Sequence, residues 1–405
     1  MPQNSVLFSL GFRPFFLLAG AYSALAVGAW AGWLGDLWGL PEVYPSGALH
    51  AHEMMFGFAL AAIAGFLLTS VPQWTGAKPL RGWGLMALAA SWLLGRVGVL
   101  AAGAVGPLAA MLMDMIYPIA LCAVIGAMLI GARNRRNYGF IGLLAGAVLA
   151  NFCWHLEMSG LADTIEGAYA DELAGTGLKM MLNLLLIFVA IMGGRVIPMF
   201  SANWMRRQGQ DLAPRHPEWL KRLCIYGLIL VLVAEFLSPV LDDRIIGVLA
   251  VVVGLAYLYR LWGWNGYKTY GHSLVWILHL AYFWLGLALL LKGGHYLGPE
   301  IPIAIPDSAA RHAAAVGAVG TMIMALMPRV SLGHTGRDLI LPRPMLLAYA
   351  LILTAPFLRV ASPFLEGEMY ELTLMASGLV WMAAYALFVW CFAPMLLAAR
   401  VDIAK

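Results

Sequence analysis

The stretch HAHEMMFGF, residues 50–58, decides how the rest of the chain is interpreted. Two histidines and a glutamate stand where an apolar run that continues to Val71 begins. An ionisable side chain inside a membrane-spanning segment costs about 2.5–3.5 kcal/mol on insertion scales, so its default interpretation is functional. Imidazole and carboxylate groups are ligands of transition metals, and the stretch therefore predicts the edge of a metal or haem site.

The composition indicates an integral membrane protein. Of the 405 residues, 62% are hydrophobic and 11% are charged, whereas soluble domains carry about 25% charged residues. The net charge of +4 does not indicate nucleic acid, because the basic residues lie in short loops between apolar runs. The four cysteines have no paired spacing, which excludes a CxxCH haem attachment and a cysteine-rich iron–sulfur motif. No basic region precedes the first apolar run, so we expect a retained N-terminus rather than a cleaved signal peptide.

Apolar runs of about 17–25 residues predict membrane-spanning helices. We expect an all-α, polytopic membrane protein with about twelve such helices, in one transmembrane domain over residues 1–405 and with no separate soluble domain. The predicted helices cover residues 14–34, 51–71, 83–103, 107–131, 138–158, 179–200, 222–239, 245–264, 272–292, 309–328, 344–362 and 372–396.

The loop charges predict the orientation of these helices. Cytoplasmic loops are rich in Lys and Arg, and every second loop of this chain is basic, as at residues 133–136, whereas the loops between them are acidic, as at residues 366–371. The alternation holds along the whole chain. We therefore expect both termini to lie in the cytoplasm.

The predicted orientation gives each histidine a depth. Five lie at the outer ends of helices, and three lie toward the cytoplasmic side. The outer layer contains His50, His52, His155, His295 and His312, and the inner group contains His272, His279 and His334. A single intramembrane histidine is often only a helix–helix hydrogen bond, but a layer of several at matched depth is typical of haem or copper ligation. His216 lies in a polar loop and is interpreted as an ordinary surface residue.

Three local patterns leave alternatives open. On a regular helix His50 and His52 point about 200° apart, so they face different centres, or one ligates a metal while the other binds a propionate or moves a proton. Arg96 and Arg195 lie in apolar runs and need an anionic partner, either a haem propionate or a protein carboxylate from Glu157, Asp114 or Glu235. The small residues of AAAVGAVG, 313–320, suit the close approach of a porphyrin or of another helix.

Five ordered motifs carry a resemblance to a known family. They are GFRPFFLLAG (11–20), HAHEMMFGFALAAIAGFLLTSVPQWTG (50–76), GGRVIPMFSANW (193–204), LHLAYFWLGLAL (278–289) and RHAAAVGAVGTMIMALMPRVSLGHTGR (311–337). On these motifs the chain resembles the NnrS family, which are multi-pass proteins of the bacterial cytoplasmic (inner) membrane, contain haem and copper, and act in the response to nitric oxide. The resemblance implies one or two haems of b-type and copper. Ala281 stands where the family usually has glycine, a mild departure.

The resemblance also implies site residues. Carried over motif by motif, the cofactor ligands are His50, His52, His279, His312 and His334, and the polar partners are Glu53, Arg195 and Asn203. His155, His272 and His295 lie outside the matching motifs, so their roles are less firmly assigned; we still include His155 and His295 among the candidate metal ligands. Glu53 and Glu157 are the candidate proton carriers.

Three functions remain open at the level of the sequence. The first is an enzyme that reduces nitric oxide to N2O with electrons from a membrane quinol, with the outer histidines at the reactive site and His279 and His334 at a second centre or relay. The second is a non-catalytic haem and copper protein that binds nitric oxide and protects against nitrosative stress. The third is a transporter of metal or small anions, against which stand the two separate histidine depths and the lack of an inverted repeat.

Overall fold

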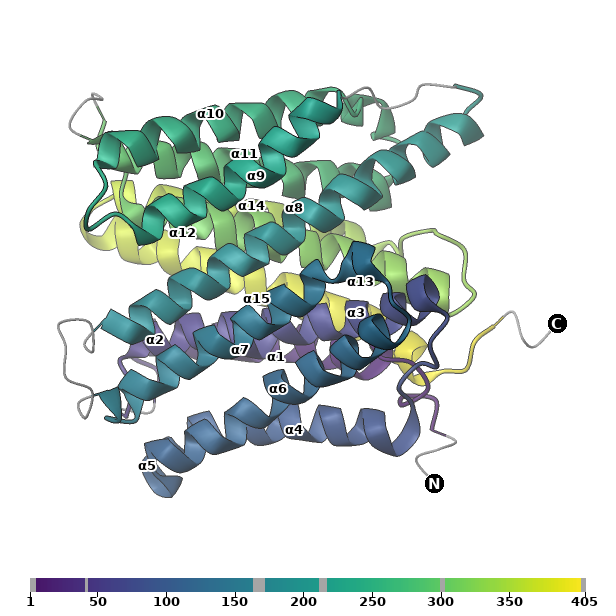
Figure 1. Ribbon diagram of the computed structural model, residues 1–405, viewed down its shortest axis with the longest axis horizontal. Coiled ribbons are helices and arrows are strands. Elements are labelled where there is room, and N and C mark those ends of the chain that lie inside the picture. Colours follow the sequence, from purple (N-terminus) through teal and green to yellow (C-terminus); the bar gives the residue numbers. More distant parts are fainter. Residues whose placement is uncertain (1–4, 41–42, 163–171, 211–216, 299–302, 402–405) are drawn as a thin grey trace. The chain divides into compact units, whose positions relative to one another are not determined.

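The computed structural model describes residues 5–40, 43–162, 172–210, 217–298 and 303–401, and over these residues it is built from helices without strands (Figure 1). The helices of the first half are α1 (Phe12–Leu34), α2 (Ser46–His52), the π-helix η2 (Glu53–Ala59), α3 (Leu60–Thr75), α4 (Gly82–Leu100), α5 (Ala102–Val105), α6 (Pro107–Gly131) and α7 (Gly139–Met158). Those of the second half are α8 (Leu173–Arg207), α9 (Glu218–Phe236), α10 (Asp243–Trp262), α11 (Ser273–Tyr296), α12 (Asp307–His312), the π-helix η8 (Ala313–Gly320), α13 (Thr321–His334), α14 (Pro344–Ala361) and α15 (Gly367–Leu397).

The all-α, polytopic membrane fold predicted from the sequence is confirmed. Within the described residues, eleven helices are long and apolar enough to cross a membrane. The predicted segment 222–239 overlaps α9, a helix of 19 residues that is not among these eleven because it carries four charged residues, Glu218, Lys221, Arg222 and Glu235. The cytoplasmic position of both termini stays a prediction.

The chain divides into two compact units. Unit 1 comprises Met1–Leu184, Val330–Asp338 and Tyr385–Lys405, and unit 2 comprises Leu185–Arg329 and Leu339–Ala384. Three of the four boundaries fall inside α8, α13 and α15, so these helices contribute to both units, and the fourth lies between α13 and α14. The expectation of one transmembrane domain without a separate soluble domain stays a prediction.

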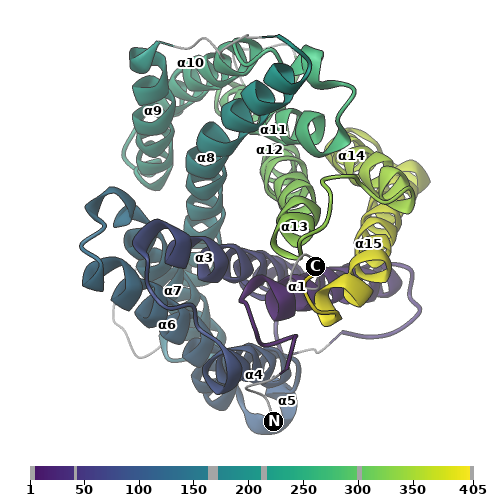
Figure 2. The ribbon, with the colours of Figure 1, turned by 90° about the vertical axis from the view of Figure 1, so that its right-hand side faces the viewer.

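Within unit 1, α6 packs between α4 and α7, and α3 packs on both α1 and α6 (Figure 2). Within unit 2, α10 packs along α9 and α11, and η8 packs on α11 and α14. The α10–α11 contact depends on glycine, because a β-carbon on Gly254 would lie 3.0 Å from the carbonyl oxygen of Gly286. Small residues let two membrane helices bring their backbones together, which is how helices associate where burial of apolar surface gives no advantage over lipid.

Two of the long helices contain a π-helical segment directly after a histidine. The π-helix η2 begins after His52, and η8 begins after His312. In both cases a proline precedes the first turn, Pro45 in one helix and Pro306 in the other. A π-helical turn changes the direction in which the following side chains point, and such turns are frequent at functional sites. The change of helix type therefore marks both histidines as positions of interest.

Candidate metal centre

Four helices of unit 1 bring a buried polar cluster together. His52 ends α2 and Glu53 begins η2, so the two side chains are consecutive. Arg96 comes from α4 and Asp114 from α6. Asn151 and His155 lie four residues apart on α7 and therefore share one face of that helix.

The cluster is inaccessible to solvent. His52 and His155 are 0% exposed, Asp114 is 1% exposed, and Arg96 and Glu53 are 3% and 4% exposed. Buried charges persist only when they are paired or coordinate a metal. Each charged group of this cluster must therefore find its partner inside the protein.

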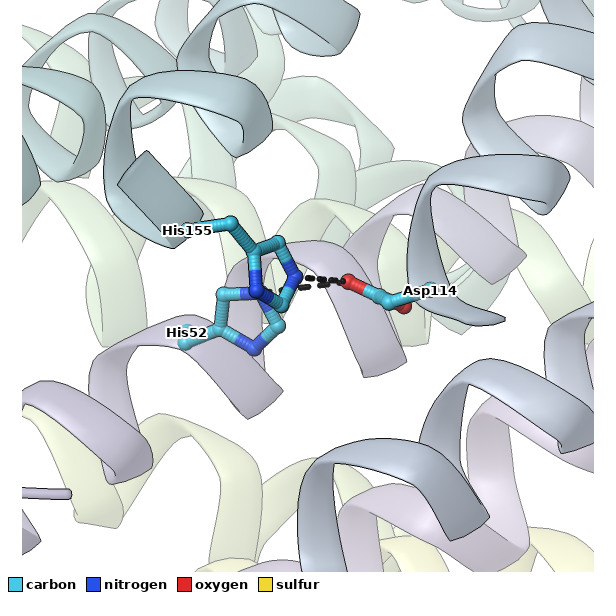
Figure 3. A group of neighbouring side chains, drawn as sticks. All are labelled: His52, Asp114 and His155. Carbon is cyan, nitrogen blue, oxygen red and sulfur yellow. Dashed lines mark hydrogen bonds and ion pairs between the residues drawn. The ribbon is translucent and has the colours of Figure 1, made fainter. Parts of the chain in front are cut away.

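Both imidazole rings face the carboxylate of Asp114 (Figure 3). The Nε2 atom of His155 lies 3.0 Å from Oδ2 of Asp114, and Nε2 of His52 lies 3.4 Å from the same oxygen. One ligand atom from each residue can be chosen so that all three lie within 4.8 Å of one another. Ligands about 2.0–2.2 Å from one ion lie about 3.0–3.5 Å apart when their angle is between a right angle and the tetrahedral value. Both observed separations fit this range.

The groups behind the candidate ligands have the arrangement found at metal sites. Nδ1 of His52 lies 2.8 Å from Oε1 of Glu53, and this contact leaves Nε2 facing Asn151 and Asp114. Metal-ligating histidines almost always bond through the other ring nitrogen to a carboxylate, carbonyl or water. The indole of Trp154 stacks on the His52 ring with centroids 4.0 Å apart and fixes its plane. Asn151 donates from Nδ2 to Oδ2 of Asp114 at 2.9 Å, and its Oδ1 lies 2.8 Å from Nε2 of His52.

Arg96 joins the two carboxylates. It donates from one terminal nitrogen to Oε1 of Glu53 at 2.5 Å and from the other to Oδ1 of Asp114. Tyr22 donates its hydroxyl to the second oxygen of Glu53. For Arg96 the alternative of a protein carboxylate is therefore confirmed, and the haem propionate is not needed to explain its burial.

The charges of the cluster do not cancel when the imidazoles are neutral. Arg96 supplies one positive charge, whereas Glu53 and Asp114 supply two negative charges. An uncompensated charge in a dry interior is strongly unfavourable. A proton on one imidazole or carboxylate would balance the cluster, and so would a metal cation held by the His52–Asp114–His155 group.

Two glycines make room for this arrangement. A β-carbon on Gly95 would collide with Oδ1 of Asp114 and lie 3.1 Å from its α-carbon. One on Gly57 would lie 2.6 Å from the Tyr22 ring and 3.1 Å from the Arg96 guanidinium. Gly95, the first glycine of LLGRVG (93–98), is thus required for α4 to approach the carboxylate of Asp114.

Tyr44 precedes α2 and borders the cluster. It is 2% exposed, and its ring lies 5.0 Å from that of Trp154 between centroids. Burial raises the pKa of Tyr44 to about 12, and the nearby Asp114 carboxylate adds to the rise. The phenol therefore stays protonated at neutral pH and is a hydrogen-bond donor beside the cluster.

The remaining predicted residues of unit 1 have other contacts. His50 stacks on Trp30 with ring centroids 4.5 Å apart, which agrees with the expectation that His50 and His52 face different surroundings. The ring of His334 lies 5.6 Å from that of Phe12. Glu157 accepts a hydrogen bond from the backbone of Ala174 at 2.7 Å, at the start of α8.

In unit 2 three predicted histidines are oriented by backbone carbonyls. Nδ1 of His279 lies 3.2 Å from the carbonyl oxygen of Val275, and Nδ1 of His312 lies 2.7 Å from that of Ser308. His295 makes the same contact with Ile305 at 2.9 Å. This contact makes Nε2 the atom that can ligate a metal; in His279 that atom lies 3.2 Å from Oγ of Ser201.

The predicted outer layer is divided between the two units. His50, His52 and His155 belong to unit 1, and His295 and His312 belong to unit 2. Over the residues that the structure describes, the one group of three or more histidine, cysteine or acidic side chains with suitably close ligand atoms is His52, Asp114 and His155. Ligation by His50, His279, His295, His312 and His334, and the roles of Arg195 and Asn203, stay predictions. His216 lies outside the described residues.

Tryptophan side chains pack against the glycines of η8. A β-carbon on Gly317 would lie 2.5 Å from the indole of Trp284, and one on Gly320 would collide with the indole of Trp381. Of the two alternatives open for residues 313–320, packing within the protein holds at these glycines. The indoles of Trp284 and Trp381 occupy the space beside them.

Asp114 and Asn151 are the functional candidates that the sequence did not single out. The sequence presents Asp114 as a possible partner for an arginine, and it is the one acidic residue in the 25 residues of α6. Asn151 stands one helical turn before His155, in NFCWHLE, 151–157. A carboxylate within an apolar span and an amide one turn from a histidine are the signals that identify them.

The comparisons with known proteins agree with the resemblance found in the motifs. The family model described as NnrS protein matches residues 6–400, nearly the whole chain. No curated protein matches it. The chain therefore belongs to the NnrS family, and this membership supports a membrane protein of the nitric oxide response.

Proposed function

We propose that this protein removes nitric oxide in the bacterial cytoplasmic membrane by reducing it to N2O with electrons from the quinol pool. The observation that supports the proposal is the buried His52–Asp114–His155 group, a set of candidate metal ligands of which His52 lies near the start of a membrane-spanning helix. Membership of the NnrS family supports a role in the nitric oxide response, and we propose nitric oxide itself as the substrate.

The reaction balances with one quinol. Two NO and one quinol give N2O, water and quinone, so the quinol provides both electrons and both protons. A reduced transition metal bound at the group would supply one-electron chemistry and a coordination position for NO. Two imidazoles and a carboxylate suit copper or iron; we propose copper, in agreement with the family.

Glu53 is the proposed proton carrier. It lies between the hydroxyl of Tyr22 and Nδ1 of His52, and it shares Arg96 with Asp114. With Nε2 of His52 on a metal, Nδ1 carries the ring proton and donates it to Glu53, so this carboxylate would take up and release its own proton on the side of the Tyr22 hydroxyl. Glu157 is the other candidate proton carrier, and it accepts a hydrogen bond from the backbone of Ala174 at the start of α8.

Haem is part of the proposal. His50, His279, His312 and His334 would be the candidate ligands of the haem iron, and Arg195 would bind a propionate. In His279 and His312 the backbone contact of Nδ1 leaves Nε2 as the ligating atom, which is the tautomer that haem iron requires. A reduced-minus-oxidised visible spectrum of each His→Ala variant identifies the histidines whose loss removes the haem bands.

The test is anaerobic consumption of NO by the purified protein in proteoliposomes with a reduced quinol. We expect multiple turnovers for the wild type, and loss of both turnover and bound copper in His52→Ala and His155→Ala. His216→Ala, in a predicted polar loop, is the matched control and should retain both. Uptake that stops at one NO for each metal would favour the non-catalytic NO-binding protein. A wild-type protein that is folded but colourless and metal-free would contradict the proposal, and it would favour a role of the histidines in helix packing or in transport.

A further inference from the structure

A second cluster lies in unit 2 and is cationic and aromatic. It is formed by the last turns of α8, the start of α11, and the helices α13 and α14. Its members are Phe200, Trp204, Arg207, His272, Arg329 and Tyr349. None of them belongs to the His52–Asp114–His155 group.

Arg329 is the centre of this cluster. Its guanidinium carbon lies 3.5 Å from the centroid of the Phe200 ring, so one face of the cation is held by the aromatic π-system. One terminal nitrogen, Nη1, is buried and has no hydrogen-bond partner. In the described part of the chain no carboxylate forms an ion pair with Arg329.

Tyr349 presents a second buried polar atom without a partner. The residue is 1% exposed, and its hydroxyl has no hydrogen-bond partner. Tyr349 is close enough to Arg329 for the two groups to interact electrostatically. Buried polar groups without partners are rare in proteins and call for an explanation, such as a bound ion. Here both atoms can donate, so the missing partner is an acceptor.

The charges around the cluster indicate that the missing acceptor is an anion. His272 precedes α11, and its ring packs edge-on against Trp204 with centroids 4.7 Å apart. Burial lowers the pKa of His272, and the positive charges of Arg329 and Arg207 lower it further. Two arginines thus act on the same imidazole. A bound anion would relieve their mutual repulsion and accept from the unpartnered donors.

We propose that this cluster binds a phosphate group, supplied by the headgroup of an anionic phospholipid. The guanidinium fork matches phosphate oxygens, and basic pockets between membrane helices are the usual binding sites of anionic headgroups. Arg207 is the last residue of α8, and His272 directly precedes α11, so the cluster lies where apolar spans meet polar loops. Tryptophans such as Trp204 are enriched at the same depth of a bilayer. Free phosphate carries the same oxygens and is the alternative source.

The experiment is native mass spectrometry of the full-length protein released from nanodiscs. One set contains phosphatidylcholine with a minor fraction of phosphatidylglycerol, and the other contains phosphatidylcholine with inorganic phosphate in the buffer. We expect the wild type to retain phosphatidylglycerol selectively. Arg329→Gln should lower the retained fraction about tenfold, as expected for loss of a charge-assisted hydrogen bond. Arg206→Gln, the same change at an exposed neighbouring arginine, should leave it unaltered.

Tyr349→Phe provides a second variant that keeps the charge and removes the unpartnered hydroxyl, and it should lower retention several-fold even if Arg329→Gln does not fold. Equal retention of phosphatidylglycerol by the wild type and both variants would overturn the proposal. So would retention of phosphatidylcholine at the same level. Binding of inorganic phosphate without selective retention of phosphatidylglycerol would overturn the lipid as the source.

Discussion

Arg96 and Asp114 form the ion pair that holds α4 to α6 beneath the candidate metal centre. The same guanidinium binds Glu53, so one cation sets the position of a candidate ligand and of a candidate proton carrier. Because Asp114 gives Oδ1 to Arg96, its other oxygen, Oδ2, is directed at His52 and His155. The ion pair is thus a structural support for the site.

Asp114→Asn is expected to weaken metal binding while keeping the side-chain volume. The substitution removes the anionic ligand, and we expect an affinity loss of at least about tenfold. Metal analysis and metal titration of the purified variant measure the effect. Asp36→Asn, an exposed position outside the cluster, is the control and should bind metal as the wild type does. Full metal content in Asp114→Asn would contradict the assignment.

Arg96→Gln is expected to destabilise the protein by about 3–5 kcal/mol, because two buried carboxylates lose their counter-charge. The measurement is the free energy of unfolding, or the shift in Tm, in a mild detergent. Arg81→Gln makes the same change at the exposed start of α4 and should shift the stability by less than about 0.5 kcal/mol. Similar stabilities of the two variants would show that the buried ion pairs are not essential.

Gly95→Ala is expected to separate α4 from α6, since its β-carbon would collide with Asp114. The expected cost is about 1–3 kcal/mol of stability, as for other overpacked positions, together with reduced metal content. Gly142→Ala in α7 meets nothing within 4 Å and should be neutral or slightly stabilising. Thermal unfolding of both variants, with metal analysis, tests the difference.

Glu53→Gln is expected to retain most of the metal and to lower NO turnover by about 10²–10⁴-fold, because the amide cannot carry the proton. Glu157→Gln should keep turnover close to that of the wild type, since the side-chain carbonyl can still accept from Ala174. Turnover normalised to bound metal is the measurement. A larger loss of NO turnover in Glu157→Gln than in Glu53→Gln would identify Glu157 as the proton carrier.

The sequence by itself determined the all-α membrane fold, because the length and composition of each apolar run are local properties. It also identified His52, Glu53 and His155 as candidates and separated His50 from His52, since helix geometry alone sets the angle between them. Eleven of the predicted spans coincide with helices apolar enough to cross a membrane. Family membership, too, was evident from the ordered motifs.

Only the tertiary structure decided which of these groups meet. Asp114 lies in α6 and Asn151 in α7, and nothing in either helix specifies a partner in α2. Their meeting with His52 depends on the packing of four helices, on the space left by Gly95, and on the π-helical turn after His52. In the tertiary structure, the indoles of Trp284 and Trp381 occupy the space beside Gly317 and Gly320 of η8. Contacts between distant segments depend on the shape and charge of side chains in three dimensions. The hydrophobic periodicity of a single helix does not predict them.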